Sequence, residues 1–274
     1  MAYTTGMNLK LTGFAMLSAV LLTTGCAAID STSKQREKEN FLVFLLAGQS
    51  NMAGRGEVTE ADRIPDPRIL MLAQDRSWQP ATDPVHFDKP RAGTGLARSF
   101  ARVLTERDKN ITIGLVPAAC GGSPISTWVP GGYHEQTESH PYDDAIERTR
   151  RALKDGRLAG ILWHQGESDG RPQRAALYRQ NLLELIERFR QDLDAPDVPF
   201  IIGQLGQFEG KPWTEARYQV NQAQIEVARQ TPYSVFISSD GLTAKADNTH
   251  FNRESLQEFG RRYANAWLEI AGEQ

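Results

Sequence analysis

Long apolar runs alternate along this chain with segments whose apolar residues recur at helical spacing. The first run begins at Phe41 and reads Phe-Leu-Val-Phe-Leu-Leu before Ala47 and Gly48. Six apolar residues without polar alternation are typical of a strand that is covered on both faces, as in a parallel sheet. Shorter apolar runs predict four more strands, over residues 111–116, 160–163, 200–204 and 234–238.

Helical periodicity fills the segments between these runs. Residues 95–108 place their apolar side chains on one face of a helix. The same spacing predicts further helices over residues 142–154, 173–192, 214–230 and 253–270. Five strands interleaved with helices predict the α/β class, as a three-layer α/β/α sandwich around a mostly parallel five-stranded sheet.

Two stretches lack such periodicity. Residues 57–91 are rich in Pro and Asp, so we expect an irregular excursion over the surface there. Residues 117–141 contain many Gly, Pro, Ser and His residues and predict a long surface loop, of the kind that often carries function. Neither an internal repeat nor a linker interrupts residues 41–274, which we expect to form a single domain.

The N-terminus differs in kind from this alternating body. Lys10 precedes an apolar run over residues 11–22, which is too short to span a bilayer. A single basic residue before a short apolar run is typical of a secretory signal peptide. We therefore expect residues 1–25 to direct export.

Cys26 follows this segment and adds a second interpretation. A small residue before cysteine resembles a bacterial lipobox, although Thr23 departs from its pattern. Lipidation of Cys26 and plain secretion therefore both stay open. In either case residues 26–40 form a polar tether, and the protein is expected to be periplasmic, membrane-anchored through the lipid, or secreted.

Composition excludes several function classes. The chain has 274 residues, of which 40% are hydrophobic and 24% charged, as in ordinary globular proteins. The net charge of −3 and a pI near 6.0 give no basic surface for nucleic acid, so we expect no such partner. Cys26 and Cys120 are the only cysteines, which excludes a CxxC metal site and predicts a small buried side chain at Cys120.

Ser50 follows the first strand in a glycine-rich turn, at the edge where parallel sheets bind ligands. A serine at this place is often only a turn former or a helix N-cap. The glycine spacing of residues 48–56 does not fit a Walker loop, and Met52 occupies the second glycine position of an α/β-hydrolase elbow. Ser50 is therefore a candidate nucleophile whose interpretation depends on partners elsewhere.

Asp247 and His250 supply a candidate acid and base. A serine hydroxyl needs a base within hydrogen-bond reach and a carboxylate that holds the imidazole in its productive tautomer. Three residues apart, Asp247 and His250 can lie on one side of a turn, with Nε2 facing Ser50. The alternative is a surface pair that merely precedes a helix. His164, beside the third strand, is expected to be structural rather than the base.

Two further strand ends provide candidate oxyanion donors. These donors are the amides of Ser50, Gly121 and Gly122 and the carboxamide of Gln165. Alternatively, the glycines only make a turn and Gln165 only ties loops together. Glu167 is open to three roles: a supporting carboxylate, a loop organiser, or the acid partner in place of Asp247.

Together these motifs resemble carbohydrate esterase family 6 of the SGNH-hydrolase superfamily, which includes acetylxylan esterases and is related to sialate O-acetylesterases. The four matching blocks are residues 48–52, 121–123, 163–169 and 247–251. The resemblance covers the chain beyond its N-terminal segment and implies a flavodoxin-like α/β/α architecture. The site roles that it implies are Ser50 as nucleophile, His250 as base, Asp247 as its partner, and Gly121 or Gly122 with Gln165 in the oxyanion hole.

We therefore expect a serine esterase that removes O-acetyl groups from carbohydrates through an acetyl-enzyme, without a metal ion or an organic cofactor. Acetylxylan-type plant polysaccharides are the leading substrate class. Sialate O-acetyl esters, with Arg55 selecting the sugar carboxylate, are the alternative, and a non-catalytic carbohydrate-binding surface lipoprotein is a third. The expected substrate-binding side chains are Gln49, Asn51, Arg55 and Trp128, with Tyr133 and Trp213 as further candidates for sugar stacking.

Overall fold

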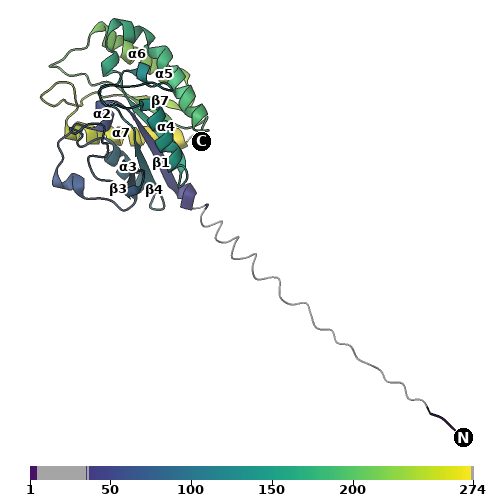
Figure 1. Ribbon diagram of the computed structural model, residues 1–274. Helices are drawn as coiled ribbons and strands as arrows, with labels where there is room; N and C mark the ends of the chain where they lie inside the picture. Colours follow the sequence, from purple (N-terminus) through teal and green to yellow (C-terminus); the bar gives the residue numbers. More distant parts are fainter. Residues whose placement is uncertain (5–34, 36, 273–274) are drawn as a thin grey trace. The chain divides into compact units, whose positions relative to one another are not determined.

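The computed structural model describes residues 1–4, 35 and 37–272, and a seven-stranded sheet forms the centre of the unit that begins at Glu37 (Figure 1). Its strand order is β3-β2-β4-β1-β5-β6-β7, and every neighbouring pair is parallel except β2 with β3. The strands are β1 (Phe41–Gly48), β2 (Ile69–Leu72), β3 (Trp78–Pro80), β4 (Thr112–Pro117), β5 (Arg157–His164), β6 (Phe200–Gly203) and β7 (Ser234–Ile237).

The predicted count of five strands is wrong, because β2 and β3 both lie in residues 57–91, where we expected only an irregular excursion. β2 has four residues, and β3 has three and ends at Pro80. Such short strands toward the edge of a sheet are too brief for periodicity to register. The remaining five strands and the helices confirm the α/β prediction, with ends that differ by a few residues.

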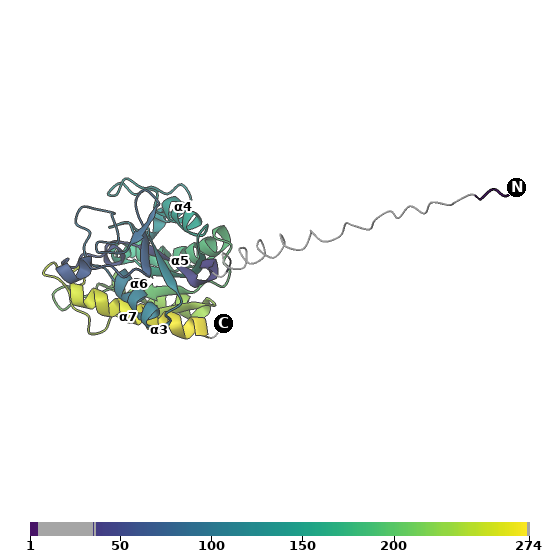
Figure 2. The same cartoon turned by 90° about the horizontal axis from the view of Figure 1, so that it is seen from below.

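Helices cover both faces of the sheet (Figures 1 and 2). On one side of β1, Phe44 contacts Phe100 of α3 and Trp267 of α7, with ring centroids 4.8 Å and 5.3 Å apart. On the other side, Val43 and Leu45 belong to the core formed with α4, α5 and α6. The helices are α3 (Ala97–Arg107), α4 (Pro141–Ala152), α5 (Pro172–Asp192), α6 (Glu215–Gln230) and α7 (Arg253–Gly272). The expected three layers are thus present.

β1 lies at the switch point of this sheet. Its two neighbours, β4 and β5, follow it in sequence but flank it on opposite sides. In open α/β sheets a crevice forms beyond the carboxyl ends of the strands at such a point. The loops that leave β1, β4 and β5 therefore meet there, and these loops carry three of the four motif blocks.

The predicted signal peptide and polar tether lie mostly outside the residues that the structure describes. Residues 5–25 of the expected signal peptide, Cys26 and most of the expected tether are not among the described residues. Within the described part, residues 37–40 are helical and lead directly into β1. None of the helices in the described ranges has the length and apolar character that crossing a membrane requires.

Candidate active site

The chain turns sharply at Gly48, the last residue of β1. Its φ is +135°, and a Cβ atom at this position would lie 2.1 Å from the backbone oxygen of His164. Only glycine allows β1 and β5 to approach so closely here. The Gln49 amide then donates to that same oxygen at 2.9 Å, and the short helix α2 (Ser50–Ala53) begins. The end of the strand thus places Ser50 at the switch point, where it is 6% exposed.

Ser50, His250 and Asp247 form a continuous chain of hydrogen bonds. His250 Nε2 lies 3.0 Å from Ser50 Oγ, and His250 Nδ1 lies 2.8 Å from Asp247 Oδ2. Since a carboxylate only accepts, the imidazole proton belongs on Nδ1 and Nε2 is free to accept from the serine hydroxyl. This geometry is that of a serine nucleophile with its general base and orienting acid.

A tight turn fixes the acid against the base. Asp247 Oδ1 accepts from the backbone amides of Thr249 and His250, each at 2.9 Å. Asn248 between them has a φ of +48°, a left-handed conformation that asparagine tolerates better than most residues. Partial burial alone would raise the pKa of Asp247, but the hydrogen bonds from His250 and Thr249 outweigh it and lower the pKa to about 2. Asp247 is therefore ionised throughout the neutral range.

Asn51 ties this turn to the end of β1. Its Nδ2 donates to Glu167 Oε1 at 2.6 Å and to the Thr249 backbone oxygen at 3.2 Å, while its Oδ1 accepts from the Phe251 amide at 3.1 Å. The two backbone contacts lie on either side of His250. We expected Asn51 to bind substrate, but it is 1% exposed and its amide is committed to the protein. Its place is that of a positioning residue for His250.

Of the three roles left open for Glu167, the structure favours that of a loop organiser. Asp247 and not Glu167 is the carboxylate beside His250, and Glu167 accepts from Asn51, which joins the loop after β5 to the end of β1. His164 is fully buried, and its Nε2 donates to the Gln204 backbone oxygen at 2.9 Å. Burial lowers the pKa of His164 despite the carboxylate of Glu167, which lies 3.8 Å from Nδ1. The expected structural role of His164 is thus in line with its surroundings.

Two of the four expected oxyanion donors keep a free N–H. The amides of Ser50 and Gly122 donate to no acceptor among the described residues. Gly121 differs, because its amide donates to Asp88 Oδ2 at 2.9 Å. Gln165 differs as well: it is fully buried, and its Nε2 lies 3.0 Å from the Ser123 backbone oxygen and 2.5 Å from Asp169 Oδ2.

The expectation that Gly121 and Gln165 serve as donors is therefore corrected in this structure. The Gly121 amide holds the loop after β4 against Asp88, and the Gln165 carboxamide ties that same loop to the loop after β5. Gly122 stays a candidate, and its φ of +92° explains why glycine is required there.

The other expected substrate contacts are also corrected, because these side chains are buried. Gln49 is 3% exposed, and its Oε1 lies 3.4 Å from the amides of Gly166 and Ser168. Arg55 pairs with Asp88 at 2.6 Å, so its guanidinium is committed to the protein. Trp128 is fully buried with its ring 5.0 Å from that of Trp163, so it offers no face to a sugar.

The remaining aromatic candidates differ in exposure. Trp213 is 8% exposed, and its Nε1 donates to the Gly206 backbone oxygen. Tyr133 is 48% exposed and lies beside His140. Tyr133 alone of the three expected aromatic residues keeps an accessible ring.

Sequence reasoning missed two carboxylates that support the site. Asp169 is 1% exposed, and it accepts from the Ile125 amide at 3.0 Å as well as from Gln165. Burial raises its pKa. Asp169 stands in the third motif block, four residues after Gln165, which was an available signal. Asp88 lies in residues 57–91, where the sequence pattern contained no signal for a site residue.

Two expectations concern metal and thiol chemistry. In the part of the chain that the structure describes, no group of three or more His, Cys, Asp or Glu side chains is arranged to hold a metal ion. Cys120 is 7% exposed, and burial raises the pKa of its thiol to about 11. Cys120 is therefore the small buried side chain that the sequence suggested.

Comparison with known families identifies the chain. Residues 40–269 match the family described as carbohydrate esterase, sialic acid-specific acetylesterase. A probable carbohydrate esterase of Arabidopsis thaliana is 33% identical over 247 residues, which cover 82% of this chain and 90% of that protein. The chain belongs to this family of carbohydrate esterases. Its members are carboxylic ester hydrolases, and the finer assignment to carbohydrate esterase family 6 stays a prediction.

Solved structures agree in fold. An Arabidopsis thaliana protein superimposes with a TM-score of 0.73 at 31% identity, over 84% of this chain and 98% of that one. NanS superimposes with a TM-score of 0.70 at 20% identity, over 87% of this chain and 99% of NanS. A carbohydrate acetylesterase from Xanthomonas citri superimposes with a TM-score of 0.65 at 20% identity, over 86% of this chain and 57% of that one. The last two show the shared fold only.

Proposed function

We propose that the protein removes O-acetyl groups from carbohydrates through an acetyl-enzyme on Ser50. The observation that carries this proposal is the hydrogen-bond chain from Asp247 through His250 to Ser50, at 2.8 Å and 3.0 Å. A serine in such a chain is activated for attack on an acyl carbon. Membership of a carbohydrate esterase family supports the choice of an acetylated sugar.

The proposed reaction has two halves. Ser50 Oγ attacks the acetyl carbonyl while its proton moves to His250 Nε2, and the amides of Ser50 and Gly122 receive the oxyanion. His250 then gives that proton to the sugar oxygen, the ester C–O bond breaks, and the acetyl group stays on Ser50. In the second half His250 takes a proton from the water that attacks the acetyl carbon. The bond from that carbon to Ser50 Oγ then breaks, His250 returns the proton to Ser50 Oγ, and acetate leaves. Asp247 orients the imidazole and stabilises the positive charge that the ring carries between each proton uptake and its return.

For the sugar we propose a neutral polysaccharide of the acetylxylan type. Arg55 was the cation expected to select a carboxylated sugar, and its pairing with the buried Asp88 supports a neutral ligand instead. Sialate O-acetyl esters are the second candidate, favoured by the description of the matching family. The intact hydrogen-bond chain disfavours a purely carbohydrate-binding lipoprotein.

The location of the protein is part of the proposal. A polysaccharide substrate requires an exported enzyme, and the sequence of residues 1–25 fits export. Attachment through a lipid on Cys26 stays open beside plain secretion.

Acetate release tests this function directly. The purified protein is compared on acetylated xylan, acetylated monosaccharides and O-acetyl sialic acid. We expect the highest kcat/KM on acetylated xylan, and we expect Ser50→Ala and His250→Ala to lower kcat by about 10³-fold or more. Ser126→Ala, a change at an exposed serine, is the matched control and should keep the activity of the wild type. Equal acetate release by Ser50→Ala and the wild type would contradict the proposal.

A further inference from the structure

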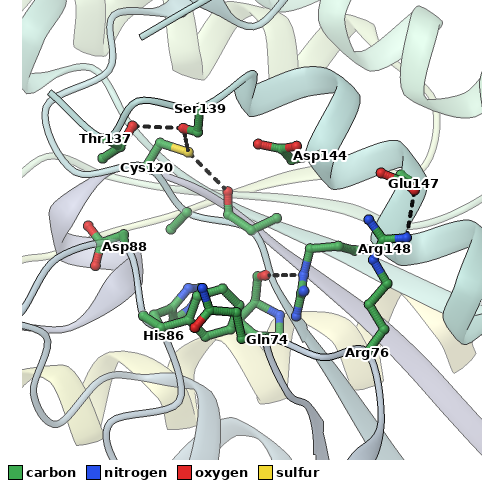
Figure 3. Close-up of a pocket in the computed structure, with 14 residues that line it drawn as sticks. Gln74, Arg76, His86, Asp88, Cys120, Thr137, Ser139, Asp144, Glu147 and Arg148 are labelled. Atoms are coloured by element: carbon green, nitrogen blue, oxygen red, sulfur yellow. Dashed lines mark hydrogen bonds and ion pairs between the residues drawn. The ribbon is translucent and has the colours of Figure 1, made fainter. Parts of the chain in front are cut away.

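A cavity of about 270 Å³ lies at the carboxyl end of β4, beside the loop that carries Gly121 (Figure 3). We name it the His86 cavity after the residue that distinguishes it. His86 and Cys120 are buried in its wall, while Gln74 and Arg76 are exposed at its rim. The members of the hydrogen-bond chain, Ser50 among them, do not line it. The cavity is thus adjacent to the candidate active site but separate from it.

His86 is a buried polar side chain with an unpaired ring nitrogen. It is 3% exposed, and its Nε2 forms no hydrogen bond to any described residue. Burial lowers its pKa to about 3, so the ring is neutral and has one donor and one acceptor. Leaving a buried polar group unpaired costs about 1–3 kcal/mol. Because His86 lines the cavity, its ring is a candidate hydrogen-bond partner for an occupant.

The other walls offer both polar and apolar contacts. The hydroxyls of Thr137 and Ser139 hydrogen bond to each other at 2.8 Å, and the side chain of Gln74 makes no hydrogen bond to the described residues. Ala118, Ala119 and the ring of Phe87 supply apolar surface. A sugar ring has the same two characters, with hydroxyl groups at its edge and C–H groups on its faces.

Charges around the cavity balance one another. Arg76 pairs with Glu147 at 2.6 Å. Arg148 is held mainly by backbone oxygens, among them that of Pro117 at 3.0 Å, and its guanidinium lies 4.8 Å from the centre of the Phe87 ring. Asp144 at the wall offsets its charge. Since no charge is left in excess, the cavity favours neither an anion nor a cation.

We propose that the His86 cavity binds one neutral sugar unit of the acetylated carbohydrate, outside the unit whose ester is cleaved. The volume lies just below the range of roughly 300–1,000 Å³ of small-molecule sites, which fits one ring and not a longer segment. Asp88 links the cavity to the active site, because it lines the cavity and accepts from the Gly121 amide at 2.9 Å. The proposal rests on the proposed function for the source of the sugar.

Two substrates separate this subsite from the ester-cleaving residues. An acetylated xylo-oligosaccharide fills both, whereas 4-nitrophenyl acetate reaches only Ser50. We expect His86→Ala and Gln74→Ala to lower the ratio of kcat/KM between the two substrates by about ten-fold, through KM of the oligosaccharide, because each removes one hydrogen-bond partner of the sugar. Gln79→Ala is the matched control, an exposed glutamine on β3 outside the cavity, and it should leave both substrates unaffected.

Binding without catalysis makes the test independent of esterase activity. Unacetylated xylotetraose is titrated calorimetrically into the full protein and into both variants. We expect binding to the wild type and about ten-fold weaker binding to Gln74→Ala, whose exposed position leaves the fold intact. Equal binding to wild type and variants overturns the subsite, as does no binding at all. Tighter binding of N-acetylneuraminic acid than of xylotetraose overturns the neutral ligand. Failure to hydrolyse either ester, with xylotetraose still bound, contradicts the esterase proposal alone.

Discussion

The two halves of the candidate active site are built in different ways. Ser50 stands at the end of the central strand, is 6% exposed, and takes its position from the backbone of β1 and β5. Asp247 and His250 lie on a surface turn, where the side chain of Asp247 is 47% exposed and that of His250 15%. The nucleophile is thus positioned by the interior of the sheet, whereas the base depends on individual hydrogen bonds.

Several of those bonds come from distant parts of the chain. Asn51 holds the backbone on both sides of His250, and Lys211 Nζ donates to Thr249 Oγ1 at 2.9 Å. Beyond the turn, Arg253 pairs with the buried Asp62 at 2.7 Å. The hydrogen bonds from Arg253 and Thr59 hold the pKa of Asp62 well below its usual range, although burial opposes them. A loop held in this way can fail without the fold failing.

We expect the largest effect at Gly48, where the nucleophile meets the sheet. Gly48→Ala places a Cβ atom 2.1 Å from a backbone oxygen at a φ of +135°, so β1 and β5 must separate. We expect a loss of about 4 kcal/mol or more in the free energy of unfolding, and activity lost together with the fold. Urea unfolding followed by circular dichroism measures this change.

The control for Gly48 is Gly131→Ala. Gly131 also has a positive φ, of +71°, but no heavy atom lies within 4 Å of an added Cβ. Gly131→Ala should therefore lower the free energy of unfolding by only about 1–2 kcal/mol. If both variants lose the same amount, the close approach of β1 and β5 does not position Ser50.

Asn51→Ala tests the half of the site that depends on individual hydrogen bonds, the turn that carries His250. The change leaves the Glu167 carboxylate and the Phe251 amide without a partner, and it frees the backbone around His250. We expect kcat to fall about 10- to 100-fold with little change in KM, because the base is misplaced and not removed. Stability should fall by about 2–4 kcal/mol. Steady-state kinetics at a temperature well below the melting point separates the two effects.

Asn110→Ala, at an exposed asparagine before β4, is the control for Asn51. We expect wild-type kinetics from it. An Asn51→Ala enzyme whose kcat equals that of the wild type would show that the turn holds His250 unaided.

The smallest effect concerns the pH dependence of the exposed acid. The pKa of Asp247 is lowered from 3.8 to about 2 in the folded protein, so its stabilising contribution is complete above the unfolded value of 3.8. That contribution is lost as the pH falls through about 2. We expect Asp247→Asn to lose about 1 kcal/mol or less at pH 6, since an exposed pair is screened by solvent.

The free energies of unfolding of the wild type and Asp247→Asn are measured at pH 6 and at pH 3. The difference between the two proteins should be smaller at pH 3 than at pH 6. A difference that grows on acidification would mean that Asp247 is not held as the carboxylate partner of His250.

Local sequence predicted the parts of this site that depend on neighbours in the chain. The unbroken apolar run from Phe41 predicted β1, and the spacing of Asp247 and His250 predicted that both reach one side of a turn. The donor role of Gly121 could not be judged in this way, because its amide hydrogen is taken by Asp88, which lies far from it in the chain. Gln165 donates to the distant Ser123 backbone oxygen and to Asp169, and only Asp169 is near enough in sequence to be a local signal. The strands β2 and β3 were too short for any pattern.

By itself the sequence determined that strands alternate with helices, and it offered Ser50, His250 and Asp247 as candidate nucleophile, base and acid, with Glu167 left open as the acid. Such features follow from periodicity and residue chemistry, which act over a few neighbouring positions. The tertiary structure alone decided which side chains keep free donors and which are used up inside the protein. It buried Asn51, Arg55 and Trp128 and left His86 Nε2 unpaired among the described residues, because burial and hydrogen-bond satisfaction depend on contacts between segments far apart in the chain.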